Sequence, residues 1–266
     1  MTKIPLRITV LGSGTSTGVP TIGCRCPVCR SLDPRNKRLR TSILITRKDT
    51  GQHILIDTSP DLRQQMIRAN VRDLQHVLYT HTHADHTHGF DDLRAFFFHS
   101  KKAVQVFLSE DNVDEFKVRF AYAFMPTGYL GITPQIDIKL LADNFEVIGL
   151  PIQRIRLPHG HVLTNAFRIG SFAFATDFKE FGPAEIAAWQ GAVEIMIASG
   201  LRFSPHPTHS TIDETIALFD KLAVKHGIIT HLSHDVDYAR DSPKLPHGYR
   251  FAYDGMTISV DVDVEG

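Results

Sequence analysis

Four side chains that can bind a metal fall within six residues, directly after a short apolar run. Residues 77–80 have the composition of a β-strand and are followed by HTHADH at positions 81–86. Alternate side chains of a strand point to opposite faces, so these groups converge only if the chain turns straight after the strand. Imidazole nitrogen and carboxylate oxygen suit zinc, manganese or iron. The sequence therefore predicts a metal site at the end of a strand.

The rest of the chain alternates short β-type runs with helical segments. The β-type runs lie at residues 6–11, 42–46, 53–57, 77–80, 104–108, 152–157, 166–175, 193–198 and 228–231. Helix starts are predicted at Ser59-Pro60, at Ser109, and at Thr211, which has capping-box spacing to Glu214. Asp254-Gly255 suits a tight turn and predicts a hairpin between residues 249–253 and 256–260. This mixture indicates an α/β or α+β fold without distinguishing one sheet from two stacked sheets.

Length and composition predict a globular protein with one domain over residues 1–266. The chain has 29 basic and 29 acidic residues, and this zero net charge argues against a dedicated duplex-DNA binder. No apolar run approaches the ~20 residues that cross a bilayer, and the N-terminus lacks an apolar signal core. Three cysteines crowded into residues 24–29 do not form a disulfide framework. We expect a cytoplasmic protein with a metal at these cysteines and no membrane partner.

Charge is nevertheless uneven along the chain. Residues 25–48 hold eight basic side chains and one acidic side chain, a local excess of seven positive charges. Such a run is typical of a solvated face, and it would also suit a collar that attracts an anionic substrate. A second biased stretch, residues 116–129, is rich in aromatic side chains. Core packing is the default for it, while a pocket wall or a homodimer patch is the alternative for Tyr122, Phe124 and Tyr129.

At this point the sequence resembles the metallo-β-lactamase-fold hydrolases, over nearly the whole chain. The matching motifs are Leu55-Ile56-Asp57, His81-Thr82-His83-Ala84-Asp85-His86, Leu157-Pro158-His159-Gly160-His161, Ala175-Thr176-Asp177 and Ile229-Thr230-His231-Leu232-Ser233-His234. The resemblance implies an α+β, αββα sandwich of two mixed sheets flanked by helices, with metals at one edge.

The resemblance also assigns ligands for two divalent ions, manganese or zinc and alternatively iron. His81, His83 and His159 would hold one ion, and Asp85, His86 and His231 would hold the other. Asp177 would bridge them. His161 competes with His159, which is favoured because it directly follows Leu-Pro at the end of a β-type run.

Asp57 would orient a ligand imidazole, although an aspartate closing a strand can also simply bond the turn.

The cysteines narrow the resemblance to a branch similar to the PhnP-like phosphodiesterases. Cys24, Cys26 and Cys29 offer three thiolates, one short of a tetrahedral zinc shell, and His234 is the natural fourth ligand. In that group three cysteines and a late histidine hold a structural zinc. PqqB-like biosynthetic proteins share the opening motif, so the cysteines alone do not fix the reaction.

His209 precedes the predicted helix at Thr211, where the resembled phosphodiesterases place a histidine that protonates the leaving oxygen. His206 is the alternative, disfavoured by its position between two prolines. We therefore expect His209 and Asp85 to be catalytic. The activity expected is hydrolysis of a small or cyclic phosphodiester, favoured over nucleic acid. A tRNase Z-like nuclease and a PqqB-like biosynthetic or binding protein remain alternatives; a glyoxalase II-like thioesterase is less favoured.

Overall fold

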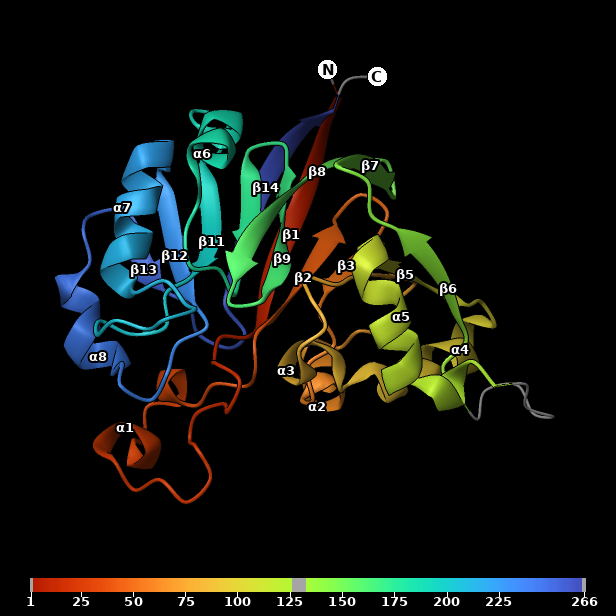
Figure 1. Ribbon diagram of the computed structural model, residues 1–266, viewed down its shortest axis with the longest axis horizontal. Helices are drawn as coiled ribbons and strands as arrows, with labels where there is room; N and C mark the ends of the chain where they lie inside the picture. Colours follow the sequence, from red (N-terminus) through yellow and green to blue (C-terminus); the bar gives the residue numbers. More distant parts are fainter. Residues whose placement is uncertain (1, 126–132, 265–266) are drawn as a thin grey trace.

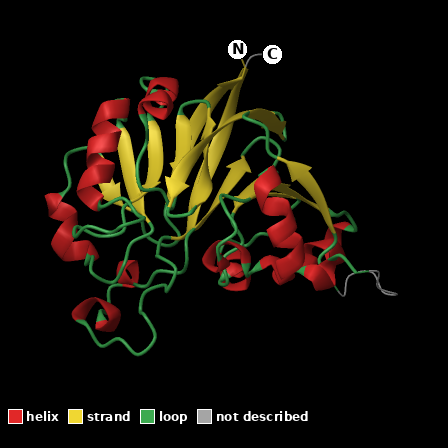
Figure 2. Cartoon of the chain, viewed as in Figure 1, coloured by secondary structure: helices red, strands yellow, loops and turns green. Residues whose placement is uncertain are grey.

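Two β-sheets are stacked face to face and covered by helices on their outer sides. A computed structural model describes residues 2–125 and 133–264. In Figure 1, α6 and α7 lie outside one sheet, and α2, α4 and α5 lie on the side of the other. Figure 2 shows the strands as the centre of this arrangement and most helices at its periphery. The predicted α+β sandwich is therefore confirmed.

Each sheet has seven strands within the described ranges. The first sheet has the order β14 (Thr257–Val264), β1 (Thr2–Gly12), β2 (Ser42–Arg47), β3 (His53–Ile56), β4 (His76–Leu78), β5 (Val104–Leu108) and β6 (Ile136–Leu140). The second has the order β13 (Tyr249–Phe251), β12 (His226–Thr230), β11 (Ile195–Ser199), β10 (Phe172–Ala175), β9 (Val162–Ile169), β8 (Leu150–His159) and β7 (Asn144–Val147).

The helical elements are mostly short. The α-helices are α1 (Pro27–Arg30), α2 (Leu62–Arg68), α3 (Ala84–Thr87), α4 (Arg94–Ser100), α5 (Glu110–Arg119), α6 (Pro183–Trp189), α7 (Ile212–Leu222) and α8 (Tyr238–Asp241). The 3₁₀ turns are η1 (Pro34–Asn36), η2 (Phe90–Leu93), η3 (Ala121–Ala123) and η4 (Ser242–Lys244). Within residues 2–125 and 133–264, no helix has the length and apolar character needed to span a bilayer.

Alternation along the strands explains why the sheets stack. The even-numbered residues of β1 from Ile4 to Val10 face the core between the sheets, and β14 buries Ile258, Val260 and Val262 in the same core. Strand β10 is buried on both faces, because one face packs on the other sheet and the opposite face packs under the helices. Phe174 belongs to the core between the sheets, and Ala173 belongs to the core beneath α6 and α7. Apolar burial on both faces is what a central layer of a sandwich requires.

Helix starts follow the local sequence signals in two of three cases. Thr211 caps α7, and its side chain and that of Glu214 form the predicted capping box. Ser109 stands at the N-cap of α5, although its hydroxyl bonds Asn165 instead of the helix. The start predicted at Ser59-Pro60 is two residues early, because the Ser59 hydroxyl accepts from the Asp61 amide and α2 begins at Leu62.

The hairpin predicted at Asp254-Gly255 is wrong. Strand β13 pairs in parallel with β12, whereas β14 pairs antiparallel with β1 in the other sheet. The chain crosses between the sheets at Asp254, whose carboxylate accepts from the amide and hydroxyl of Ser13 and from the amide of Leu39. These contacts, from residues more than 200 positions away, decide the path of the chain.

Candidate metal centre

The candidate ligands lie where strands of both sheets end. Asp57 directly follows β3, the HTHADH segment follows β4, and His159 is the last residue of β8. Asp177 and His231 follow β10 and β12. Since β3 runs parallel to β4, and β10 runs in the same direction as β12 in the second sheet, their carboxyl ends share one edge. Carboxyl ends of parallel strands are where such folds gather ligand-binding groups.

Three of these residues have left-handed backbone conformations. The φ angles are 65° at Asp57, 52° at Asp177 and 58° at His231. A non-glycine residue in this region costs about 1–3 kcal/mol and persists only where its surroundings impose it. In each case the conformation ends the strand and turns the next residues away from it.

The HTHADH segment turns as the sequence predicts. His83 stands at the N-cap of the one-turn helix α3, which carries Asp85 and His86. The ring centroids of His81 lie 4.4 Å from those of both His83 and His86. His159 reaches the same place from β8, with its ring centroid 5.0 Å from that of His83.

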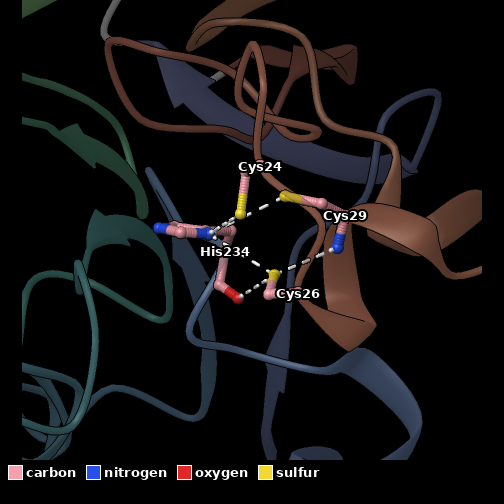
Figure 3. Close-up of side chains that lie close together, drawn as sticks. All are labelled: Cys24, Cys26, Cys29 and His234. Atoms are coloured by element: carbon pink, nitrogen blue, oxygen red, sulfur yellow. Dashed lines mark hydrogen bonds between the residues drawn. The ribbon is translucent and has the colours of Figure 1, made fainter.

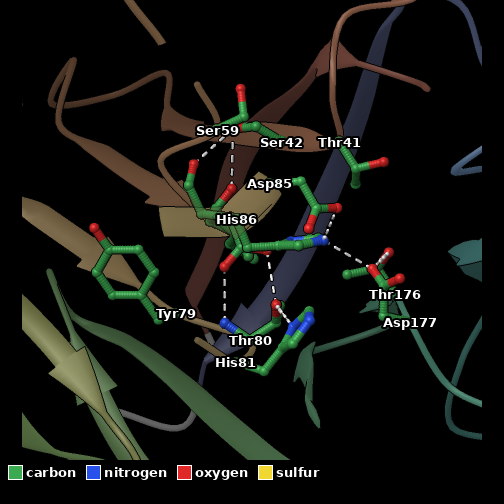
Figure 4. Close-up of polar contacts among 12 residues, drawn as sticks. Thr41, Ser42, Ser59, Tyr79, Thr80, His81, Asp85, His86, Thr176 and Asp177 are labelled. Atoms are coloured by element: carbon green, nitrogen blue, oxygen red, sulfur yellow. Dashed lines mark hydrogen bonds and ion pairs between the residues drawn. The ribbon is translucent and has the colours of Figure 1, made fainter. Parts of the chain in front are cut away.

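Asp177 lies between two groups of imidazoles. Its Oδ2 is 2.9 Å from His86 Nε2, and its Oδ1 is 3.1 Å from His231 Nε2. Asp85 Oδ2 is 3.2 Å from the same His86 nitrogen, and Figure 4 shows both carboxylates meeting at this end of the ring. The ligand-type atoms form close sets in which every pair lies within 4.8 Å: His81, His83 and His159; His81, His86 and Asp177; His159, Asp177 and His209.

Four buried nitrogens in this cluster make no hydrogen bond of normal geometry to the described residues, although three of them lie within 3.3 Å of an Asp177 carboxylate oxygen. They are His81 Nε2, His86 Nε2, His231 Nε2 and His209 Nδ1. A buried polar atom without a good hydrogen bond destabilises the fold. Four such nitrogens around one carboxylate are expected where the nitrogens bind metal ions instead. The donor set therefore fits divalent ions bound by nitrogen and oxygen.

The charges of the cluster also favour bound cations. Burial opposes a charge on His86, yet the carboxylates of Asp85, Asp177 and Asp57 raise its pKa well above the ordinary value. Burial also opposes ionisation of Asp177, but His231 and His86 hold its pKa well below the ordinary value. Three buried or nearly buried carboxylates thus need positive charge at this point.

The imidazoles of His86 and His159 are each held by a second contact on the ring nitrogen that faces away from the cluster. Asp57 Oδ2 lies 2.7 Å from His86 Nδ1, and Asp57 also accepts from the amide and hydroxyl of Thr80. His159 Nδ1 donates to the carbonyl of Thr208. Such contacts fix which nitrogen faces a metal.

Thr41 and Thr82 support the metal-binding cluster, and sequence reasoning missed both. Thr41 Oγ1 lies 3.0 Å from His231 Nδ1. The Thr82 hydroxyl donates to Glu115, and Arg119 donates to the Thr82 carbonyl, so α5 braces the HTHADH turn. Nothing in the local sequence marks these residues, because their partners lie 33 to 190 positions away.

His209 lies at the edge of the cluster, as expected from its place before α7. Its Nδ1 is 3.3 Å from Asp177 Oδ1, and its ring stacks on His231 with centroids 5.3 Å apart. Burial lowers the pKa of His209 to about 3. His206 lies one ring further out, 4.8 Å from His209, and His161 is exposed. The described ligand sets include His159 and omit His161.

The cysteines form a second cluster, shown in Figure 3. The Sγ atoms of Cys24, Cys26 and Cys29 lie 3.3, 3.5 and 3.7 Å from His234 Nδ1. A tetrahedral zinc with bonds of about 2.3 Å to sulfur and about 2.0 Å to nitrogen separates those atoms by about 3.5 Å. The Cys29 amide donates to the Cys26 thiol, and this contact outweighs burial to lower the pKa of Cys26 to about 6. The geometry and the thiolate both fit zinc.

The basic run at residues 25–48 is not one exposed collar. Arg38 is buried with 1% of its surface exposed. Arg35, Arg40 and Arg47 pair with carboxylates of Asp33, Asp61 and Asp49. Arg25 and Arg30 pair with no carboxylate within the described ranges. They are exposed on and beside α1, in the loop that projects from the body in Figure 1.

The aromatic stretch divides between core and surface. Phe116 and Phe120 are buried, as the default predicts. Tyr122 and Phe124 are 40% and 37% exposed. Tyr129 lies outside the described residues.

Comparisons with known proteins match this geometry. A family model described as a beta-lactamase superfamily domain matches residues 52–232. The crystal structure of a diphosphatase from the PhnP family superposes with a TM-score of 0.91 at 35% identity, covering 99% of this chain and 100% of that one. The chain belongs to the PhnP family of the beta-lactamase superfamily. Members of this superfamily with solved structures include hydrolases, and the fold implies divalent metal binding.

Two further proteins are similar to this chain. A Porphyromonas gingivalis protein named octanoyltransferase is 38% identical over 261 residues, which are 96% of this chain and 52% of that protein. The chain therefore spans about half the length of that curated relative. Zinc-bound PqqB from Methylobacterium extorquens superposes with a TM-score of 0.76 at 18% identity, covering 95% of this chain and 99% of that one, which shows a shared fold.

Proposed function

We propose that this PhnP-family chain is a metal-dependent hydrolase that cleaves a small phosphodiester. The observation that carries the proposal is the position of Asp177, whose two carboxylate oxygens face His86 and His231 from opposite ends. A carboxylate placed between two sets of nitrogen ligands is what a pair of divalent ions requires.

In this proposal His81, His83 and His159 would hold one ion, and Asp85, His86 and His231 would hold the other. Asp177 would be a ligand to both. Bound divalent ions would lower the pKa of a water molecule and neutralise charge on phosphoryl oxygens. Mn²⁺, Zn²⁺ and Fe²⁺ all suit this donor set.

The chain's own side chains orient the metal ligands and supply a proton to the leaving group. Asp57 accepts from His86 and keeps the opposite ring nitrogen directed at the cluster. His209 is neutral at pH 7 because burial lowers its pKa. A phosphate anion beside the ring favours the protonated imidazole, so we infer that His209 takes up a proton as substrate binds and gives it to the leaving oxygen. Asp85 would complete the catalytic set as a metal ligand, and its side chain is 14% exposed.

The cysteine cluster has a separate role. We propose that Cys24, Cys26, Cys29 and His234 hold one structural zinc, which ties the loop around α1 to the segment after β12. A closed shell of four protein ligands leaves no open position for substrate, as in structural sites.

The relatives favour phosphorus chemistry. The PhnP-family relative named a diphosphatase is matched over its whole length, which supports phosphoryl substrates and adds diphosphate esters to the small phosphodiesters. The relative named octanoyltransferase is matched over only 52% of its length, so its name can describe the part that has no counterpart here. We therefore favour phosphodiester cleavage over acyl transfer.

The test is a parallel assay of the metal-loaded protein. It compares bis(p-nitrophenyl) phosphate, 2′,3′-cyclic nucleotides, a sugar cyclic phosphate, a dinucleoside diphosphate, precursor tRNA and a glutathione thioester. We expect turnover of one or more small phosphoryl esters and none with the Asp177→Ala variant. Cleavage of precursor tRNA alone would replace the proposal with a nuclease, and cleavage of the thioester alone would remove phosphoryl transfer. No turnover of any substrate by a protein with both ions bound would favour a PqqB-like role.

A further inference from the structure

One short segment serves both clusters. His231 faces Asp177, and His234, three residues later, faces the three thiols. Residues 231–236 therefore connect the two clusters directly along the backbone. A shift of this segment would move the ligand atoms of both.

The segment starts from a strained residue. His231 has a φ of 58°, which its surroundings must impose on a residue with a Cβ atom. The backbone of Leu232 is held on both sides: its amide donates to the Ser13 carbonyl, and its carbonyl accepts from the Thr15 amide. The Thr41 hydroxyl holds the His231 ring and does not bond the backbone of the segment.

A buried guanidinium adds two further contacts to the backbone of this segment. Arg38 donates through Nη1 to the Ser233 carbonyl at 2.9 Å and through Nη2 to the Val236 carbonyl at 2.8 Å. Nη2 also donates to the side-chain oxygen of Asn36, and Nε donates to the Arg35 carbonyl. Arg38 is 1% exposed, and the four oxygens to which it donates within the described part of the chain are all neutral.

A buried cation held by neutral acceptors is expensive. Burial lowers the pKa of Arg38 to about 10, despite opposing effects of Asp254 and Asp237, so the group is still charged at neutral pH. The two carbonyls it binds flank His234 and lie in the segment that begins with the strained His231. A lysine has no rigid fork of donors and could not hold both carbonyls in this geometry.

We propose that Arg38 is a positioning residue for the ion held by His231. By fixing the carbonyls of Ser233 and Val236, it keeps the segment from relaxing and so keeps His231 Nε2 directed at Asp177. The inference rests on the proposed dinuclear function, because it assigns Arg38 to one of the two ions.

The test is a manganese titration followed by electron paramagnetic resonance. Mn²⁺ prefers nitrogen and oxygen ligands. Zinc should therefore stay in the thiolate cluster while manganese fills the histidine and aspartate cluster. We expect two bound Mn²⁺ per wild-type chain. In Arg38→Gln one of them should bind about 10–100-fold more weakly, as for other groups that support a ligand from behind, and the other should be unchanged.

A control variant separates this role from the general effect of losing an arginine that hydrogen-bonds within the fold. Arg168 donates to the Gln153 side chain and to the Gly170 carbonyl, at the end of β9 opposite to the cluster. Arg168→Gln should lower the melting temperature and leave both manganese affinities unchanged. In Arg38→Ala, adding millimolar guanidinium should restore the affinity of the weakened manganese site, because the free cation can donate to the same two carbonyls.

The outcomes are distinct. Unchanged affinities in Arg38→Gln, or equal weakening of both ions, would overturn the role of Arg38. If Arg38→Gln does not fold, the same titration is made with Arg38→Lys. Wild-type affinity for both manganese ions in that variant would overturn the role of Arg38. A wild-type chain that binds no pair of manganese ions would overturn the proposed function itself, and the Arg38 inference with it.

Discussion

Asp57 Oδ2 lies 2.7 Å from His86 Nδ1, and neither side chain is exposed to solvent. The carboxylate comes from the end of β3 and the imidazole from α3, so this contact joins two strand ends behind the cluster. It makes the imidazole a better ligand, because a negative acceptor increases the basicity of the opposite nitrogen.

Asp57→Asn should therefore weaken metal binding without removing the site. The amide keeps the shape of the side chain and loses its charge, and we expect metal affinity to fall about 10–100-fold in equilibrium dialysis. Asp49→Asn is the control, since Asp49 pairs with Arg47 at the exposed turn between β2 and β3. Equal metal affinity in the two variants would contradict the role of Asp57.

Replacing Asp177 should have a larger effect. Asp177→Ala removes the carboxylate that faces both His86 and His231, so we expect fewer than two ions per chain and loss of phosphodiester hydrolysis. Metal analysis by mass spectrometry and a chromogenic diester measure the two effects. Retained turnover with two bound ions would count against a shared carboxylate.

His209 can act as a proton donor or as a ligand, and the leaving group distinguishes these roles. If it donates a proton, His209→Asn should slow cleavage of an alkyl ester about 10²–10⁴-fold and affect a nitrophenyl ester much less. Nitrophenolate leaves without protonation, whereas an alkoxide does not. If both esters slow equally and an ion is lost, His209 is a ligand instead.

The cysteine cluster should govern stability more than chemistry. Structural zinc contributes about 10–16 kcal/mol of apparent binding free energy in small peptides, so Cys26→Ser should lower the melting temperature and remove one zinc per chain. Arg30→Gln, on the same loop and exposed, should change neither. A variant with normal zinc content and melting temperature would remove the structural-zinc proposal.

His53 should make stability depend on pH far from the cluster. Burial, with a further contribution from Arg7, lowers the pKa of His53 below 6.5, and Thr46 bonds its ring. The neutral form is favoured in the folded state. Its contribution to stability is therefore complete above pH 6.5 and is lost as pH falls toward the folded-state pKa. Urea unfolding between pH 7.5 and 5 should show a smaller loss for His53→Gln than for the wild type. An identical pH dependence would contradict this assignment.

Local signals predict local features of this fold. The capping box of Thr211 and Glu214 is readable because both partners lie within one helical turn. The HTHADH segment is readable because four ligand-type side chains adjoin one strand end. Their convergence with His159, Asp177 and His231 came from the family resemblance, since spacing along the chain does not show which strand ends meet.

Long-range partners explain what sequence reasoning missed. The path after β13 depends on Asp254 bonding Ser13 and Leu39, and no local pattern distinguishes this from a hairpin turn. Arg38 looks like one more surface charge in a basic run, yet it is buried and donates to the carbonyls of Ser233 and Val236, which lie almost 200 residues later in the sequence.

The distribution of ligands over the two sheets has a mechanical consequence. The first sheet supplies the HTHADH side chains, and the second supplies His159, Asp177 and His231. Cations bound there would link the two sheets at one edge of the sandwich, because the sheets could separate only if the cations were released. Their affinity for the native state would then add to its resistance against unfolding in proportion to the logarithm of free metal concentration.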